Sequence, residues 1–271
     1  MIQSRQELEF PLKRDSLGTM SFFENTGKEE NMRKIVIFLV ALIAFTFVET
    51  AKVKAATLSI GIKNLTNGQV FSRPIYAVGP CLPEYSPLKS DDTNSIFAIG
   101  RTASVSLEMM AEGGVTTSIT NWLRNKGWNV VIGPETISRH NHYQEAHVPV
   151  PLISPTQKLC VTVILKLLQT NDAFIAFQNV EVAGTTTTTK ILYPEVFDAG
   201  TEKNDELCVS IPSGGWSPCG SIIGQGFNPY RWPGERYVTL HTGIAGFGNL
   251  KPMDVGFNPM KSVLISFCLN S

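Results

Sequence analysis

The sequence predicts an all-β fold, an antiparallel β-sandwich with a small helical insertion. Many short runs rich in β-branched and aromatic residues recur along the chain. Turn signals separate these runs at close spacing, as in sandwich proteins. Two short segments have the apolar spacing and end signals of helices: Ala103 to Glu112, and a second that begins at Thr116 or Thr117 and ends at Lys126.

The first residues of the chain have the organisation of an export signal. Met32-Arg-Lys begins a charged region, an uninterrupted apolar stretch follows from Ile35 to Val48, and small residues surround Ala55. This order is typical of a secretory signal peptide, and the stretch is shorter than the roughly 20 apolar residues that span a bilayer. A retained signal anchor is the alternative.

We therefore expect three regions. Residues 1–31 form a leader of uncertain status, and Met32 is an alternative start. Residues 32–56 form the signal peptide, with cleavage after residue 55 or 56. Residues 57–271 form one domain that is secreted or periplasmic, without a stable membrane span after cleavage.

The charge balance argues against two classes of partner. The chain has 23 basic and 23 acidic residues and a formal net charge of +0. A protein without a basic surplus has no general attraction for nucleic acid or for an anionic membrane.

All five cysteines follow the predicted signal peptide, so they would enter an oxidising compartment, where disulfides form. Cys208 and Cys219 bracket a loop rich in Pro, Gly and Ser, and we expect them to pair. The partners of Cys81, Cys160 and Cys268 stay open, because spacing alone does not fix connectivity.

The predicted elements follow from local patterns. Leu58, Ile60 and Ile62 alternate along the first strand. Thr102 is the expected cap of the first helix and Gly113 its stop. We expect strands at residues 57–62, 128–132, 159–168, 173–182, 191–196, 237–241 and 262–267, and extended stretches at 70–78 and 148–152.

Three consecutive predicted strands bring acidic residues together. Short connections join the strands at 159–168, 173–182 and 191–196, so neighbours should be antiparallel. Their alternating directions place the turn after the first strand and the loop after the third at one end of a sheet. The acidic residues of that turn and loop are Asp172, Asp198, Glu202, Asp205 and Glu206.

Oxygen ligands from neighbouring loops are what calcium requires. The sequence therefore predicts a Ca²⁺ site held by Asp172 and Asp198, with Glu202 or Asp205 assisting. The alternative is that these are solvated turns, in which Asp and Asn are common.

Several motifs resemble those of the spondin domain family, in its bacterial single-domain form. The most specific is an Asp-Ala-Gly-Thr-acid sequence after a Tyr-Pro pair, and the resemblance covers nearly all of the chain after the signal peptide. The motifs are Asn64-Leu-Thr-Asn-Gly-Gln-Val-Phe71, Gly100-Arg-Thr-Ala-Ser104, Ala111-Glu-Gly-Gly114, Thr170-Asn-Asp-Ala-Phe174 and Tyr193-Pro-Glu-Val-Phe-Asp-Ala-Gly-Thr-Glu202.

The resemblance implies a sandwich of about eight strands, similar to calcium/phospholipid-binding domains, and a secreted adhesion module as in F-spondin and mindin. The family's two loop acids match Asp172 and Asp198. In animal members a glutamate from an earlier strand completes the site, but the matching stretch around Ala146 has no carboxylate in register. Glu145 and His147 lie close to that position without aligning.

Two functions remain in view. The first is a calcium-binding adhesion or recognition module of the cell exterior, not an enzyme, with a protein or glycan ligand. The second is an extracellular or periplasmic glycan hydrolase that uses Asp172 and a second carboxylate, which requires two carboxyl groups across an open cleft. The aromatic residues of one later region either form a platform for glycans or plug the core; they are Trp216, Tyr230, Trp232 and Tyr237.

Overall fold

Two antiparallel sheets share one apolar core in the computed structural model, which confirms the predicted sandwich. The structure describes residues 56–83, 94–152, 156–182, 189–212, 218–220, 222, 224 and 234–270. The predicted leader and signal peptide lie outside these residues. The described residues belong to one compact unit, Lys54–Ser271.

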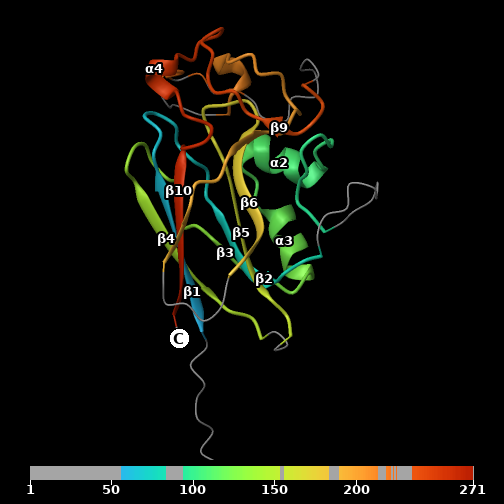
Figure 1. Ribbon diagram of the computed structural model, residues 1–271. Coiled ribbons are helices and arrows are strands. Elements are labelled where there is room, and N and C mark those ends of the chain that lie inside the picture. Colours follow the sequence, from blue (N-terminus) through green and yellow to red (C-terminus); the bar gives the residue numbers. More distant parts are fainter. Residues whose placement is uncertain are drawn as a thin grey trace, which may run out of the picture. The chain divides into compact units, whose positions relative to one another are not determined.

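The first sheet has four strands and the second has six (Figure 1). The order of the first is β4 (Tyr143–Pro149), β1 (Thr57–Asn64), β10 (Val263–Asn270) and β7 (Lys190–Leu192). The order of the second is β3 (Asn129–Ile132), β2 (Ile75–Pro80), β5 (Leu159–Lys166), β6 (Ala173–Glu181), β8 (Val196–Asp198) and β9 (Thr239–Leu240). The described residues thus form ten strands rather than about eight, because two short segments, β7 and β9, add to the sheets.

The core lies between the sheets and continues under the helices. On β1 the alternating residues Leu58, Ile60 and Ile62 are fully buried, as their spacing predicts. On β5 nearly every residue is buried, because one face meets the first sheet and the helix α2 (Val105–Gly113) packs on the other. Figure 1 shows α2 and α3 (Thr117–Asn125) together along this outer face.

The helical insertion is confirmed, with one correction to its start. Ser104, not Thr102, caps α2, because the Ser104 hydroxyl accepts a hydrogen bond from the backbone N–H of Leu107 at 3.2 Å. The helix ends at Gly113, and Gly114 takes a left-handed conformation with φ 67°. Glycine adopts this conformation without steric cost.

The third strand of the central region is divided between the sheets, which the sequence pattern does not predict. Lys190–Leu192 pairs with β10 in the first sheet, whereas Val196–Asp198 pairs with β6 in the second. The chain changes sheets at Pro194, which lacks the N–H that a ladder needs. The strand β4 is also longer than expected, and two short helices were not predicted, η1 (Cys208–Ser210) and α4 (Pro252–Val255).

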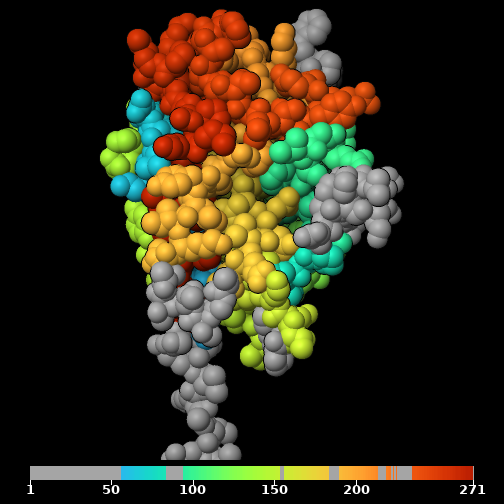
Figure 2. All heavy atoms as spheres, viewed as in Figure 1, coloured from blue at the N-terminus to red at the C-terminus, as the bar shows by residue number. Residues whose placement is uncertain are grey.

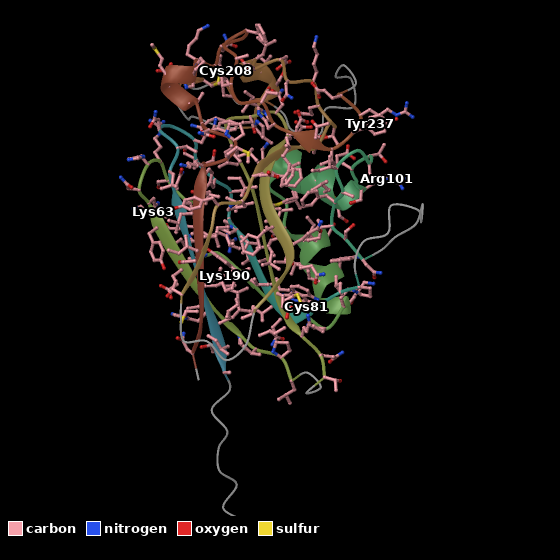
Figure 3. The ribbon with its side chains drawn as sticks, viewed as in Figure 1. Lys63, Cys81, Arg101, Lys190, Cys208 and Tyr237 are labelled. Carbon is pink, nitrogen blue, oxygen red and sulfur yellow. A yellow bond between two sulfur atoms is a disulfide. The ribbon has the colours of Figure 1, made fainter. Side chains whose placement is uncertain are left out.

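Two disulfides fix loops toward opposite ends of the sandwich (Figure 3). The predicted Cys208–Cys219 bridge is confirmed. The second joins Cys81 to Cys160, and Cys268 belongs to neither bridge.

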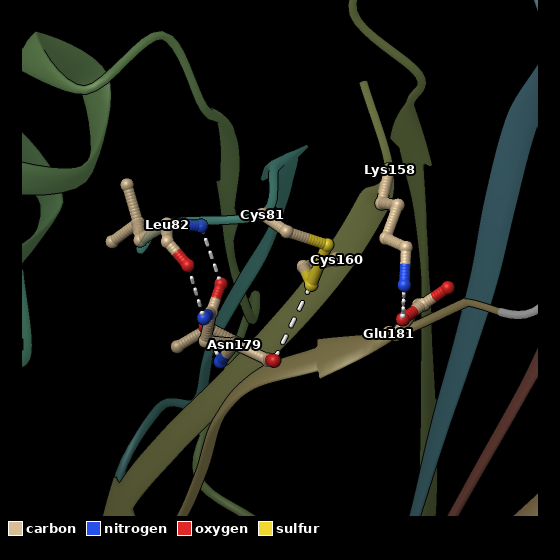
Figure 4. The surroundings of a disulfide bond; sticks show 7 residues. Cys81, Leu82, Lys158, Cys160, Asn179 and Glu181 are labelled. Atoms are coloured by element: carbon tan, nitrogen blue, oxygen red, sulfur yellow. Dashed lines mark hydrogen bonds and ion pairs between the residues drawn. A yellow bond between two sulfur atoms is a disulfide. The ribbon is translucent and has the colours of Figure 1, made fainter. Parts of the chain in front are cut away.

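A bulge in β6 lies beside the Cys81–Cys160 disulfide. The register of β5 and β6 shifts there, and Asn179 takes a positive φ of 56°. The Asn179 side chain exchanges two hydrogen bonds with the backbone of Leu82, at 2.7 and 2.9 Å (Figure 4). The bulge and the disulfide therefore hold the same loop to the sheet.

Candidate metal site at the acidic end of the sheet

The structure confirms that Asp172 and Asp198 lie side by side. Asp172 directly precedes β6, and its neighbour Ala173 pairs with Asp198 on β8. The backbone N–H of Ala199 also donates to the carbonyl of Asp172 at 3.3 Å. The strand reversals predicted from the sequence place both residues at this end, and the change of sheet between β7 and β8 then brings Asp198 next to β6.

Asp172 organises the loop that follows β8. Its Oδ2 accepts hydrogen bonds from the backbone N–H groups of Thr201 and Glu202, at 2.7 and 3.0 Å, and from the Thr201 hydroxyl at 3.1 Å. Its Oδ1 is buried and has no hydrogen-bond partner among the described residues. Because the whole residue is 0% exposed, this oxygen has no access to bulk water, and a proton or a cation would supply its missing partner.

Asp198 is held in the loop that it begins. Its Oδ1 accepts from the backbone N–H of Gly200 at 2.7 Å, and its Oδ2 accepts from the side-chain amide of Asn204. Gly200 has a φ of 67°, and a Cβ there would lie 2.5 Å from the carbonyl oxygen of Tyr237. Glycine is therefore required in the Asp-Ala-Gly-Thr motif for both conformation and space.

Burial makes both carboxyl groups hard to ionise, and at Asp198 repulsion from neighbouring carboxylates adds to this effect. Burial raises the pKa of Asp172 to about 6, against the hydrogen bonds from Glu202 and Thr201 and the charge of Lys166, which lower the pKa. Burial also raises the pKa of Asp198 to about 7, and the negative charges of Asp172 and Glu235 add to this rise. A bound cation would relieve all of these costs.

Lys166, at the end of β5, is the positive charge beneath this pair. Its side chain is fully buried, and its ammonium donates to the carbonyls of Thr170 and Asn171, at 3.1 and 2.8 Å, and to the carbonyl of Ala111 in α2. One ammonium thus joins the helical insertion to the turn that carries Asp172.

The other predicted ligands have different places. Glu202 is buried, with 2% of its surface exposed, and its backbone contacts Asp172. Asp205 accepts from the Asn171 amide at 3.1 Å, from the Leu207 N–H at 2.9 Å and from the Ser210 hydroxyl at 2.7 Å. Asp205 therefore holds its own loop in shape, and no hydrogen bond within the described residues joins it to Asp172 or Asp198.

The Glu206 carboxylate forms its hydrogen bonds with a neighbouring loop rather than with Asp172 or Asp198, as far as the described residues show. The carboxylate accepts from three consecutive backbone N–H groups, those of residues 245, 246 and 247, at 2.6, 2.7 and 2.8 Å. Buried His241 lies near this carboxylate, and burial lowers the pKa of His241 to about 4. Its Nδ1 accepts from the Gly243 N–H at 2.9 Å, so the neutral ring acts as a packing and capping group.

Sequence reasoning missed three contributors to this site. Asn204 contacts Asp198 directly, Glu235 adds negative charge from a distant part of the chain, and Lys166 lies inside an apolar run. Of the three, only Lys166 is recognisable in the sequence as a site residue, because a charged residue within a buried apolar strand requires polar partners.

No glutamate from β4 completes the pair. Glu145 and His147 are both exposed, and they pair with Gly61 and Ser59 on the solvent face of the first sheet. Across the described residues, no group of three or more His, Cys, Asp and Glu side chains is arranged to hold a metal. A cation at this end would therefore take two carboxylates and complete its shell with amide, carbonyl or water oxygens.

A scan against models of known protein families and a search of curated proteins found no match to this chain. Among the helices in the described ranges, none has the length and apolar character to cross a bilayer. Of the four aromatic residues predicted as a platform or core plug, Tyr237 is 43% exposed. Trp216, Tyr230 and Trp232 lie outside the described residues.

Proposed function

We propose that this protein is a secreted, calcium-binding adhesion or recognition module, as its resemblance to the spondin domain implies. Asp172 and Asp198 would hold the ion, and a protein or glycan of the cell exterior would be the ligand. The two disulfides support export, because such bridges form in oxidising compartments.

The observation that carries the proposal is the buried Oδ1 of Asp172. It has no hydrogen-bond partner in the described part of the chain, and it belongs to a carboxyl group beside a second buried carboxyl group. A native protein rarely buries a polar atom without a partner, and a bound cation beyond the described residues would supply one.

Calcium suits the donors that are present. It takes six to eight oxygens in flexible geometry and accepts carboxylates, amide oxygens and water together. Asp172 and Asp198 would supply the charge, and Asn204 has an amide oxygen that can become a further ligand when its NH₂ no longer donates to Asp198. The ion would supply positive charge that ties the turn before β6 to the loop after β8.

The hydrolase alternative has less support. A glycosidase needs two carboxyl groups that reach a sugar across an open cleft, whereas Asp172 is 0% exposed. Its Oδ2 is also committed to three hydrogen bonds within the loop. We therefore propose a binding role rather than an enzymatic one.

The test is calcium-dependent stability of the full chain. Calcium at about 100 times its dissociation constant should add about 2.7 kcal/mol to the free energy of unfolding. Asp198→Asn should remove most of this gain, whereas Asp254→Asn on α4, an exposed residue outside the site, should keep it. If wild type melts at one temperature in millimolar calcium and in chelator, the proposed calcium site is wrong.

A further inference from the structure

A second candidate site lies at the α4 end of the molecule, outside the acidic pair. Residues 65–67 and two later segments, 242–244 and 252–261, line an open pocket of about 420 Å³. This volume is within the range of about 300–1,000 Å³ that ligand pockets have. The residues that line it are Leu65, Thr66, Asn67, Thr242, Gly243, Ile244, Pro252, Gly256, Phe257, Asn258 and Lys261.

The pocket walls are held in place before any ligand arrives. Half-buried Phe257 packs on the buried ring of His241, with 5.2 Å between ring centroids. The N–H of Leu65 donates to the carbonyl of Ser262 at 3.0 Å, which ties the first segment to the third. A preformed wall loses little conformational entropy on binding.

The pocket has a mixed polar and apolar lining and carries one charge. Four of its lining residues, Leu65, Ile244, Pro252 and Phe257, are apolar, and Lys261 is the lining residue with an ionisable side chain. Lys261 is exposed and forms no ion pair with any residue in the described ranges. The complementary ligand is therefore an amphipathic group, with an apolar part against these four residues, polar groups for the rest of the lining, and a negative charge at Lys261.

Two exposed apolar side chains follow residues near the pocket along the chain: Phe247 follows Gly246, where a Cβ would lie 3.3 Å from Cδ of the lining residue Pro252. Phe247 is 87% exposed and Met253 is 83% exposed, and Met253 directly follows the lining residue Pro252. These side chains belong to the segment that covers one end of the sandwich in Figure 2. Aromatic residues and Met are enriched in protein–protein interfaces, so these exposed side chains favour a protein partner.

The loop that carries Phe247 is rigid rather than loose. Its backbone donates three consecutive N–H groups to buried Glu206, and Lys251 binds the carbonyls of Gly246 and Gly248 at 3.4 and 3.2 Å. These contacts fix the backbone that carries the exposed Phe247 side chain. Rigid, exposed anchors are typical of binding surfaces.

We propose that this pocket binds an acidic segment of a partner protein, with an aromatic or aliphatic side chain in the pocket and a carboxylate at Lys261. The inference rests on the proposed role as a recognition module and names its ligand class. It does not depend on calcium, because the lining includes neither Asp172 nor Asp198.

The probes are three small molecules that separate the two features of the ligand. N-acetylphenylalanine has the aromatic group and the carboxylate, its amide has the aromatic group alone, and galacturonate has the carboxylate on a sugar. Each is titrated into the full chain in chelator, with dissociation constants measured by NMR. We expect the acid to bind about threefold to fivefold more tightly than the amide, as one exposed ion pair allows, and galacturonate to bind most weakly.

Three variants test the residues. Lys261→Gln should abolish the preference for the acid, whereas Lys203→Gln, an exposed lysine outside the pocket, should keep it. Thr242→Trp places an indole at the pocket from an exposed position and should weaken both aromatic probes about tenfold or more, with an unchanged melting temperature. Asp198→Asn should bind every probe as wild type does, even if the calcium proposal fails.

Two results would overturn the inference. Equal affinity of the acid and the amide, in wild type and in Lys261→Gln alike, would remove the role of the charge. Tighter binding of galacturonate than of either aromatic probe would assign the pocket to an acidic glycan instead of a protein segment.

Discussion

Replacing Lys166 with methionine removes a buried ammonium while keeping an unbranched side chain of similar length. In wild type this ammonium satisfies the carbonyls of Ala111, Thr170 and Asn171 and lowers the pKa of Asp172 by its charge. Lys166→Met leaves the three carbonyls and the Asp172 carboxylate buried without the ammonium. The helical insertion and the Asp172 turn therefore lose the hydrogen-bond donor that they share.

The expected cost follows from the buried charge. Removing one partner from a buried charged network typically costs about 3–5 kcal/mol, and the three carbonyls do not add separately because they share one donor. For a domain of this size each kcal/mol corresponds to about 2–4 °C in melting temperature. Lys166→Met should therefore melt about 6–20 °C below wild type in chelator.

A double-mutant cycle with Asp172→Asn separates charge from packing. If Lys166 stabilises the ionised Asp172, the cycle should give a coupling of about 1–3 kcal/mol at pH 8. The coupling should shrink at pH 5, below the raised pKa of Asp172, because the carboxyl group is then protonated. Lys158→Met, which removes an exposed lysine paired with Glu181 at 2.8 Å, is the control and should barely change the melting temperature.

Additive effects at pH 8 would refute this account of Lys166. The lysine would then hold the turn through its hydrogen bonds alone, and its charge would have no part in the acidic site.

Three further predictions concern other parts of the chain. The pKa of Asp198 is raised to about 7 in the folded protein, from about 3.9 in the unfolded chain. Protonation of Asp198 therefore stabilises the fold fully below pH 4, and this contribution is lost as pH rises through 7. Asp198→Asn should therefore gain stability over wild type toward pH 8 in chelator, and a pH-independent difference in melting temperature would contradict this. Replacing both cysteines of the Cys81–Cys160 bridge, which have a sequence separation of 79, should lower the free energy of unfolding by about 4.5 kcal/mol in the chain-entropy model. The same replacement at Cys208–Cys219, with a separation of 11, should cost about 3 kcal/mol. If chemical denaturation gives the reverse order, loop length does not determine how much each bridge stabilises the fold. Amino-terminal sequencing of exported protein should find a start just after residue 55 or 56, and a mature protein that begins at Met1 would remove the export prediction.

The part of the site that depends on chain direction was predictable from sequence. Short connections reverse the chain and predict that Asp172 and Asp198 share one end of the sandwich, whereas the change of sheet that makes β8 the neighbour of β6 is not visible in the residues. Lys166 was not assigned, because its partner in α2 is 55 positions away and helix packing decides that contact. Glu235 acts on Asp198 from 37 positions later in the chain, also beyond any local pattern.

Side-chain exceptions explain the remaining errors in the fold. On β4 the inward-facing Gln144 is 7% exposed and accepts a hydrogen bond from buried Tyr76 at 3.1 Å. A polar residue at an inward position breaks the apolar alternation by which strands are found, so this strand was predicted only in part. Around Pro194 the residue pattern looks like one continuous strand although the chain changes sheets there. The periodicity of a strand shows which side chains are buried, but it does not show with which strand it pairs.

The pairing of β1 with β10 determines how the domain would carry mechanical load. Thr57 lies opposite Asn270, so the two ends of the described domain leave at the same end of one ladder, while α4 lies at the other end (Figure 1). Tension between the two chain ends would unzip this ladder one hydrogen bond after another. Tension between the N-terminal end and a ligand at the α4 end would instead run along the strands and shear their hydrogen bonds together. An adhesive protein attached by its N-terminal end and bound at the α4 pocket would therefore be pulled in its mechanically stronger direction.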